Sequence, residues 1–166
     1  MGRWLVRAAV IGMVLMWAFV LWLAVFRGRA DSPDKIEDTT FARRAQVACD
    51  ARLDLIADLP RAADAPDAAA RGRTLELANG HLAEMLDDLE ALVPLVPAGD
   101  DREIVEEWLG DWHTYLGDRQ AYAAELQRDP GAQLLVTPKG GEQVTEYLDQ
   151  FARDNDMPAC STPADA

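Results

Sequence analysis

Two histidines, two cysteines and one aromatic-rich stretch are the parts of this chain whose residue types could support chemistry. His81 and Glu84 are three residues apart, so on a helix they lie one turn apart, as metal ligands do in helical bundles. A di-metal site needs such a pair on two helices and further carboxylates, whereas this chain has the pair once and in reversed order. We therefore expect no metal site and no cofactor, and we interpret His81 as a residue on the side of a helix.

The aromatic-rich stretch, WLGDWHTYLGDRQAY at 108–122, contains the second histidine, His113. One face of a helix there would carry four candidate ligand-binding side chains: Trp112, Tyr115, Arg119 and Tyr122. An aromatic stripe at helical spacing usually packs into a core, which would bury Arg119. The alternative is a groove that binds a small ligand, because arginine can pair with a carboxylate and stack on a ring.

A buried Arg119 would need a partner for its charge. The sequence offers Asp118 beside it, or Asp50 and Asp54 on an earlier helix. Because buried arginines are seldom unpaired, we interpret Arg119 first as a member of a structural ion pair and second as a ligand contact.

Cys49 and Cys160 are too few for a zinc site, and neither lies in the basic surroundings that activate a thiol. A disulfide between them is the simplest prediction. It would close a loop of about 110 residues and hold the C-terminal sequence MPAC against the first helix of the domain. Persistent disulfides form outside the cytoplasm of ordinary mesophiles, so the pair also predicts where the domain lies.

Other catalytic motifs are missing from the sequence. It has no glycine-rich phosphate loop, no serine nucleophile elbow and no Cys-x-x-Cys. Gly110 and Gly117 are seven residues apart, so they would share one helix face and could admit a close neighbour. These observations make an enzyme the least favoured class of function.

The charge is strongly uneven. All 29 Asp and Glu residues follow residue 30, so residues 31–166 carry 12 basic against 29 acidic residues, a net charge of −17. The first 30 residues carry four arginines and no acid. An acidic body of this size repels phosphate backbones, so we expect no nucleic-acid partner.

The segment from Trp4 to Phe26 is almost entirely apolar, with Arg7 as its one charge. As a helix it would be roughly 35 Å long, enough to cross a hydrocarbon core of about 30 Å. The alternative is a cleaved signal peptide ending at GRA before Asp31, but the apolar stretch exceeds the usual length of about 7 to 15 residues. We therefore predict an uncleaved anchor that contacts the lipid bilayer.

Arginines flank this segment evenly, so the positive-inside rule does not orient it. The predicted disulfide does. We expect residues 1–3 in the cytoplasm, a single-pass span at 4–26, a linker at 27–39, an extracytoplasmic domain at 40–160 and a tail at 161–166.

Periodic apolar residues predict an all-α domain, an antiparallel bundle of three to four helices. The expected elements are helices near 41–59, 75–92, 100–126 and 145–156, with a small β-hairpin or a loop near 134–144. Thr40 and Asp100 are the expected N-caps of the first and third helices, and Pro66 could open the second.

Three stretches of the sequence are similar to stretches of other proteins: CD at 49–50, WLGDWHTYLGDRQAYAAEL at 108–126 and FARDNDMPAC at 151–160. With them the chain resembles a group of uncharacterised actinobacterial single-pass membrane-anchored proteins. The resemblance implies one N-terminal anchor and an external helical domain, and it carries no assigned activity or catalytic residue.

We expect the domain to be an interaction or structural module of the cell envelope, with an envelope protein as a possible partner. The alternative is a small-ligand-binding domain that uses the aromatic and Arg119 side of the third helix.

Overall fold

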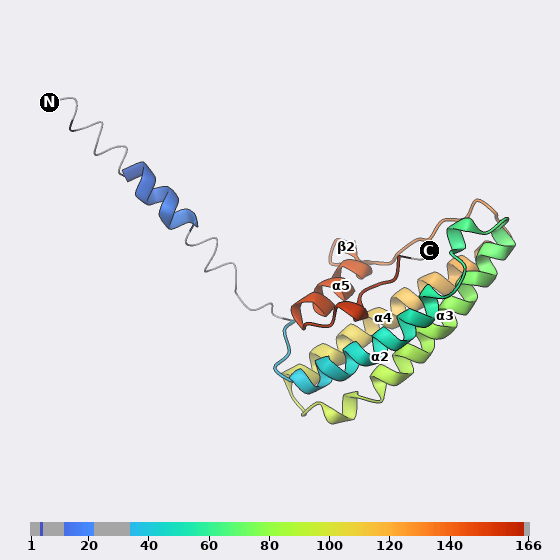
Figure 1. Cartoon of the computed structure of the whole chain (residues 1–166), viewed down its shortest axis with the longest axis horizontal. Helices are drawn as coiled ribbons and strands as arrows, with labels where there is room; N and C mark the ends of the chain where they lie inside the picture. The colour runs from blue at the N-terminus through green and yellow to red at the C-terminus, as the bar shows by residue number, and fades with distance from the viewer. Residues whose placement is uncertain (1–3, 5–11, 22–33, 165–166) are drawn as a thin grey trace. The chain divides into compact units, whose positions relative to one another are not determined.

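The computed structural model describes Trp4, residues 12–21 and residues 34–164, and it divides the chain into two units, Met1–Pro33 and Asp34–Ala166 (Figure 1). In the first unit, residues 12–21 are helical and their side chains are exposed. Among the described residues, no helix has the length and apolar character needed to cross a membrane. The predicted span from Trp4 to Phe26 lies in part outside these residues, so it stays a prediction.

Residues 34–164 form a mostly helical unit with one small antiparallel sheet, which confirms the predicted helical class and the hairpin (Figure 1). Its elements are α2 (Thr39–Ala57), η1 (Ala62–Asp64), α3 (Ala68–Glu90), η2 (Val93–Leu95), α4 (Asp100–Glu125), β1 (Pro138–Lys139), β2 (Glu142–Gln143), α5 (Val144–Asp154) and η3 (Pro158–Cys160).

Side-chain caps set the start of two helices, and the cap of α2 differs from the predicted one. Asp38 accepts hydrogen bonds from the backbone of Thr40 and Phe41, so α2 begins one residue before the predicted cap, Thr40. Asp67, next to Pro66, caps α3 through the backbone N–H of Ala70. Helix α3 therefore begins seven residues before Leu75, the first residue of the predicted stripe.

Helix α4 begins at Asp100 with Gly99 at the N-cap position, so the predicted cap at Asp100 is wrong. Its neighbour Asp101 accepts backbone hydrogen bonds from Glu37 and Asp38 instead. This carboxylate joins the segment before α2 to the first turn of α4.

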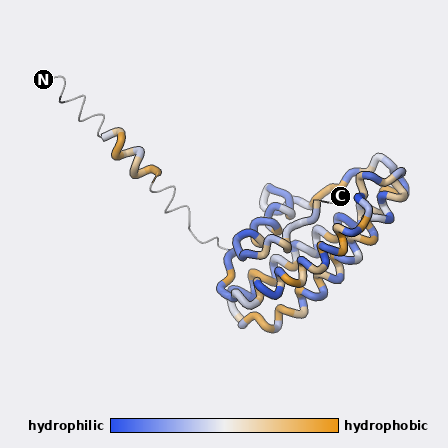
Figure 2. Tube along the Cα trace, in the orientation of Figure 1, coloured by the Kyte–Doolittle hydropathy of each residue, from blue (hydrophilic) through white to orange (hydrophobic). Residues whose placement is uncertain are grey.

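Helix α3 packs against both α2 and α4, while α5 packs on α4 and η3 packs on α2. Hydrophobic residues recur along each helix between hydrophilic ones, as the amphipathic pattern requires (Figure 2). Most of the buried side chains form one cluster, which includes Trp108, Trp112, Leu148 and Phe151. The short α5 and the C-terminal segment therefore complete the core that the three long helices begin.

The unit starts before the predicted boundary at residue 40. Ile36 is buried, and its backbone N–H donates to Oδ1 of Asn155 at 2.9 Å. The amide of Asn155 donates in turn to the carbonyl of Asp34 at 3.1 Å. Part of the predicted linker at 27–39 is thus packed against the end of α5.

The close helix approach lies at a different glycine from the predicted ones. Gly110 and Gly117 are exposed, and a Cβ added at either would meet nothing within 4 Å. Gly72 on α3 is buried, and its Cβ would lie 3.0 Å from the carbonyl oxygen of Ala123 on α4. The expectation for Gly110 and Gly117 was wrong because both face solvent.

Candidate functional site

The four predicted ligand-binding side chains, Trp112, Tyr115, Arg119 and Tyr122, are all buried on α4. Arg119 has no exposed surface, and Tyr122 is the most exposed of the four, at 9%. Tyr115 lies between its neighbours, with its ring 5.9 Å from that of Trp112 and 5.7 Å from the guanidinium of Arg119. Trp112, Tyr115 and Arg119 are therefore packed core and do not line an open groove.

Neutral side chains hold two sides of the Arg119 guanidinium. Its Nε donates to Oδ1 of Asn79 on α3 at 2.8 Å, and its Nη1 donates to the hydroxyl of Tyr115 at 3.4 Å. The predicted partner Asp118 points elsewhere, since it accepts from the backbone N–H and the hydroxyl of Thr137 at 2.7 and 2.9 Å. The other predicted partners, Asp50 and Asp54, are exposed on α2.

Tyr122 also borders a shallow hollow of about 510 Å³ between α4 and residues 133–138. Trp112, Tyr115 and Arg119 do not line it. A ligand in this hollow could touch Tyr122 but could not reach the buried guanidinium without a movement of the packed side chains.

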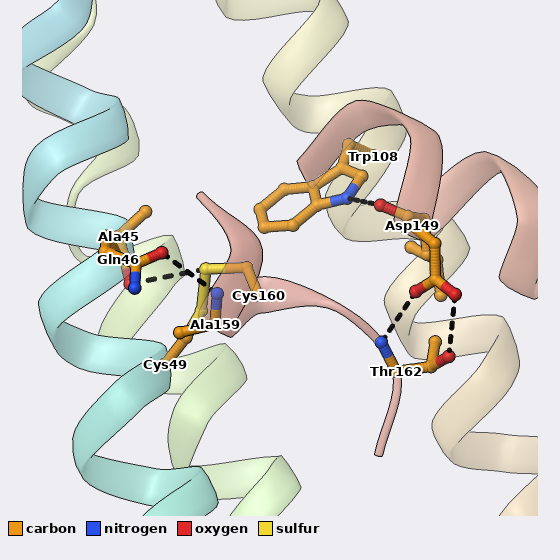
Figure 3. Close-up of a disulfide and its surroundings, with 9 residues drawn as sticks. Ala45, Gln46, Cys49, Trp108, Asp149, Ala159, Cys160 and Thr162 are labelled. Carbon is orange, nitrogen blue, oxygen red and sulfur yellow. Dashed lines mark hydrogen bonds between the residues drawn. A yellow bond between two sulfur atoms is a disulfide. The ribbon is translucent and has the colours of Figure 1, made fainter. Parts of the chain in front are cut away.

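Cys49 and Cys160 lie at bonding distance, with their sulfur atoms 2.00 Å and their Cα atoms 5.1 Å apart (Figure 3). Cys49 is in the middle of α2 and Cys160 ends η3, and both are fully buried. A bond between residues 111 positions apart removes roughly 4 to 5 kcal/mol of chain entropy from the unfolded state in the loop-closure model. The structure thus brings together the two cysteines that the sequence pairs.

Hydrogen bonds hold the segment on both sides of Cys160. The backbone N–H of Ala159 donates to the side chain of Gln46 on α2 at 3.0 Å. Thr162 donates to the carboxylate of Asp149 on α5 through its backbone at 2.7 Å and its hydroxyl at 3.3 Å (Figure 3). The predicted tail is therefore attached to α5 in its described part.

A lysine held by the β-hairpin is a site that the sequence analysis missed. Lys139 Nζ lies 2.8 Å from Glu107 and 2.7 Å from Asp111 of α4, and 5.3 Å from the ring centre of Tyr147. Burial of the ammonium opposes its charge, but the hydrogen bonds to Asp111 and Glu107 outweigh this and raise the pKa of Lys139. The turn sequence PKGG was the available signal, because it places a lysine at the tip of a tight hairpin.

The two histidines are on different helices and each contacts a glutamate. Nε2 of His113 pairs with Glu90 at the surface. Nδ1 of His81 lies 3.6 Å from Glu84, and that glutamate also binds Arg52 of α2. In the part of the chain that the structure describes, no group of three or more His, Cys, Asp or Glu side chains could hold a metal ion.

Arg52 is the main ionic link between α2 and α3. It pairs with Glu84 and with Asp88, whose Oδ2 lies 2.8 Å from Nη2. The hydrogen bond to Asp88 and the surrounding negative charge raise the pKa of Arg52.

An apolar hollow of about 280 Å³ lies where α2 ends, and Pro163 and Ala164 of the C-terminal segment form part of its wall. The other walls come from α2, the turn through η1, and α3: Leu53, Ile56, Ala57, Leu59, Pro60, Arg61, Ala62, Thr74 and Ala78. Its lining is mostly apolar, with Arg61 and Thr74 as the polar side chains.

Unlike the lining of this hollow, the outer face of α2 exposes large apolar side chains to solvent. Val47 is 70% exposed and Leu55 is 43% exposed, and the two are eight residues apart on the same face. Figure 1 shows α2 with α3 beside it. Ala51 lies between the two apolar residues and is exposed as well.

No known protein family, curated protein or solved structure matches this chain. The resemblance to actinobacterial membrane-anchored proteins therefore stays a prediction.

Proposed function

We propose that this chain is a membrane-anchored, extracytoplasmic helical domain that acts as an interaction or structural module of the cell envelope. Its N-terminal segment spans the membrane once, with the N-terminus inside and the domain outside. The observation that carries the proposal is the fully buried cysteine pair at bonding distance, because persistent disulfides belong to compartments outside the cytoplasm.

The helix described at residues 12–21 supports the anchor. Eight large apolar side chains between Met13 and Leu21 are 46 to 64% exposed. Apolar side chains exposed around a whole helix require a nonaqueous neighbour, and lipid is the neighbour that the rest of the apolar segment favours.

The burial of Arg119 and its aromatic neighbours does not favour the ligand-binding alternative. A contact with another protein is better supported than a small ligand, because the exposed face of α2 carries the apolar side chains of Val47 and Leu55 between charged ones. The net charge of −17 in residues 31–166 favours partners other than nucleic acid.

Membrane fractionation and external proteolysis of intact cells that express the full chain test this proposal. We expect the chain to sediment with membranes after alkaline carbonate extraction and its domain to be cleaved by protease added outside. Recovery in the soluble fraction, or protection of the domain until the membrane is opened, would contradict the proposal. A cytoplasmic protein of the same cells serves as the control for membrane integrity.

A further inference from the structure

One stripe of α2 faces away from the core and has a regular order of residue types. Its members recur three or four residues apart, so they share one face of the helix: Arg44, Val47, Ala51, Leu55 and Asp58. All five are exposed. The stripe therefore has a basic end, an apolar middle with a small residue at its centre, and an acidic end.

The acidic end of the stripe opposes the dipole of its own helix, and the basic end lies beyond the first turn, where the dipole acts. A helix favours acidic residues in its first turn and basic residues in its last turn, and α2 has neither. Arg44 lies near the start of α2, and Asp58 is its C-cap residue. The fold of a single copy thus gains nothing from this order of charges, and none of the ion pairs recorded among the described residues includes Arg44 or Asp58.

The stripe is complementary to itself when reversed. If two copies of α2 pack antiparallel about Ala51, Arg44 lies opposite Asp58 of the second copy and Val47 lies opposite Leu55. Ala51 then faces its own copy, and its small side chain lets the two backbones approach. A parallel pair would instead place Arg44 against Arg44 and Asp58 against Asp58, which is repulsive.

We infer that the outer face of α2 is a homodimer interface, formed by two antiparallel copies of this helix around a twofold axis at Ala51. The partner of the proposed interaction module is then a second copy of the same chain, and in this respect the inference rests on the proposed function. Residues 44–58 span about 21 Å, so a strip about 10 Å wide would bury roughly 400 Å² in total. Stable interfaces bury about 1,200 Å² or more, so the pair is weak in solution and depends on concentration by a shared membrane.

Cysteine cross-linking of the full chain in membranes tests the geometry. Ala51→Cys should give a disulfide-linked dimer when an oxidant is added, because only paired residues come within about 7 Å. Val47→Cys and Leu55→Cys should each stay monomeric alone and form a dimer when the two variants are expressed together. Ala124→Cys, an exposed alanine on α4, is the matched control and should stay monomeric.

Charge reversal tests the pairing itself. Combined with Ala51→Cys, Arg44→Asp should lower the rate of cross-linking about tenfold, because both ion pairs become repulsive. Adding Asp58→Arg should restore it. Each variant keeps its fold if the Cys49–Cys160 bond and the thermal midpoint are retained, and these exposed substitutions should change neither.

Cross-linking of Ala51→Cys no faster than that of Ala124→Cys, in protein that sediments with membranes, would overturn the dimer and leave the anchor standing. Self-linking of Val47→Cys would overturn the antiparallel arrangement. If the chain does not sediment with membranes, the proposed anchor is wrong. The same cross-linking experiments on the purified full chain at about 1 mM then test the dimer independently of the membrane.

Discussion

Arg119 shows how a buried charge is accommodated in this core. Its guanidinium lies between Asn79 on α3 and Tyr115 on its own helix. The sequence predicted that Arg119 is buried, because it falls in line with aromatic positions on α4. It could not predict Asn79, which is 40 residues away on another helix and gives no apolar signal.

Asn79→Ala should lower the free energy of unfolding by about 2 kcal/mol, since it removes a hydrogen-bond acceptor from a buried cation. Chemical denaturation measures the change. Gln120→Ala, an exposed position beside Arg119, is the control and should change stability by less than about 0.5 kcal/mol. Equal effects of the two substitutions would show that the Asn79 contact contributes nothing.

Lys139→Gln should destabilise the domain by about 1 kcal/mol near neutral pH, because a partly exposed ammonium loses Glu107 and Asp111. The pKa of Lys139 is raised in the folded state, so this stabilisation is fully present below the unfolded pKa of about 10.4 and is lost as pH rises through the folded pKa.

The difference in unfolding free energy between wild type and Lys139→Gln should therefore stay constant up to about pH 10 and shrink between about pH 10 and pH 12. Arg153→Gln at an exposed position of α5 controls for the loss of one positive charge. A difference that stays constant over this range would refute the ion-pair role of Lys139.

At the scale of elements, the helices were predictable and their ends were less so. Apolar periodicity indicated α2, α4 and α5 because each buries one face. The ends depend on single capping residues: Asp38 caps α2 in place of the nearby Thr40, and Asp67 caps α3 directly after Pro66. The hairpin was predictable from PKGG, but its strands of two residues each are too short to give an alternating pattern.

Two glycines differ in role: Gly117 occupies an exposed helix position, and Gly140 occupies a turn position with positive φ that favours glycine. Gly117→Ala should stabilise the domain by about 0.5 to 1 kcal/mol, because alanine favours the helix and its Cβ meets nothing within 4 Å. Gly140→Ala should destabilise it by about 1 to 2 kcal/mol, because Gly140 has a φ of +58° and the new Cβ would lie 2.3 Å from the Tyr147 hydroxyl.

Thermal and chemical denaturation of Gly117→Ala and Gly140→Ala measure both effects. A loss of stability in Gly117→Ala would mean that a neighbour packs closely against this face of α4, as the spacing of Gly110 and Gly117 predicted. An unchanged Gly140→Ala would mean that the hairpin turn tolerates a side chain.

At the scale of the molecule, the cysteine pair connects distant parts of the sequence. With only two cysteines in the chain, pairing Cys49 with Cys160 needed no knowledge of the fold. The contacts around the pair could not be predicted, because the segment after α5 is polar and short and has no periodicity. Thr162 and Ala159 bind α5 and α2, so the apparent tail closes the domain.

The location of the domain is the central claim, and the redox state of this pair in cells tests it most directly. Intact cells that express the full chain are treated with a thiol reagent that adds mass, before and after reduction, and the chain is resolved on a gel. We predict that neither Cys49 nor Cys160 is labelled until a reductant is added under denaturing conditions, and that both are labelled afterwards. Labelling of both cysteines in denatured protein without reductant would contradict the disulfide and the extracytoplasmic location together.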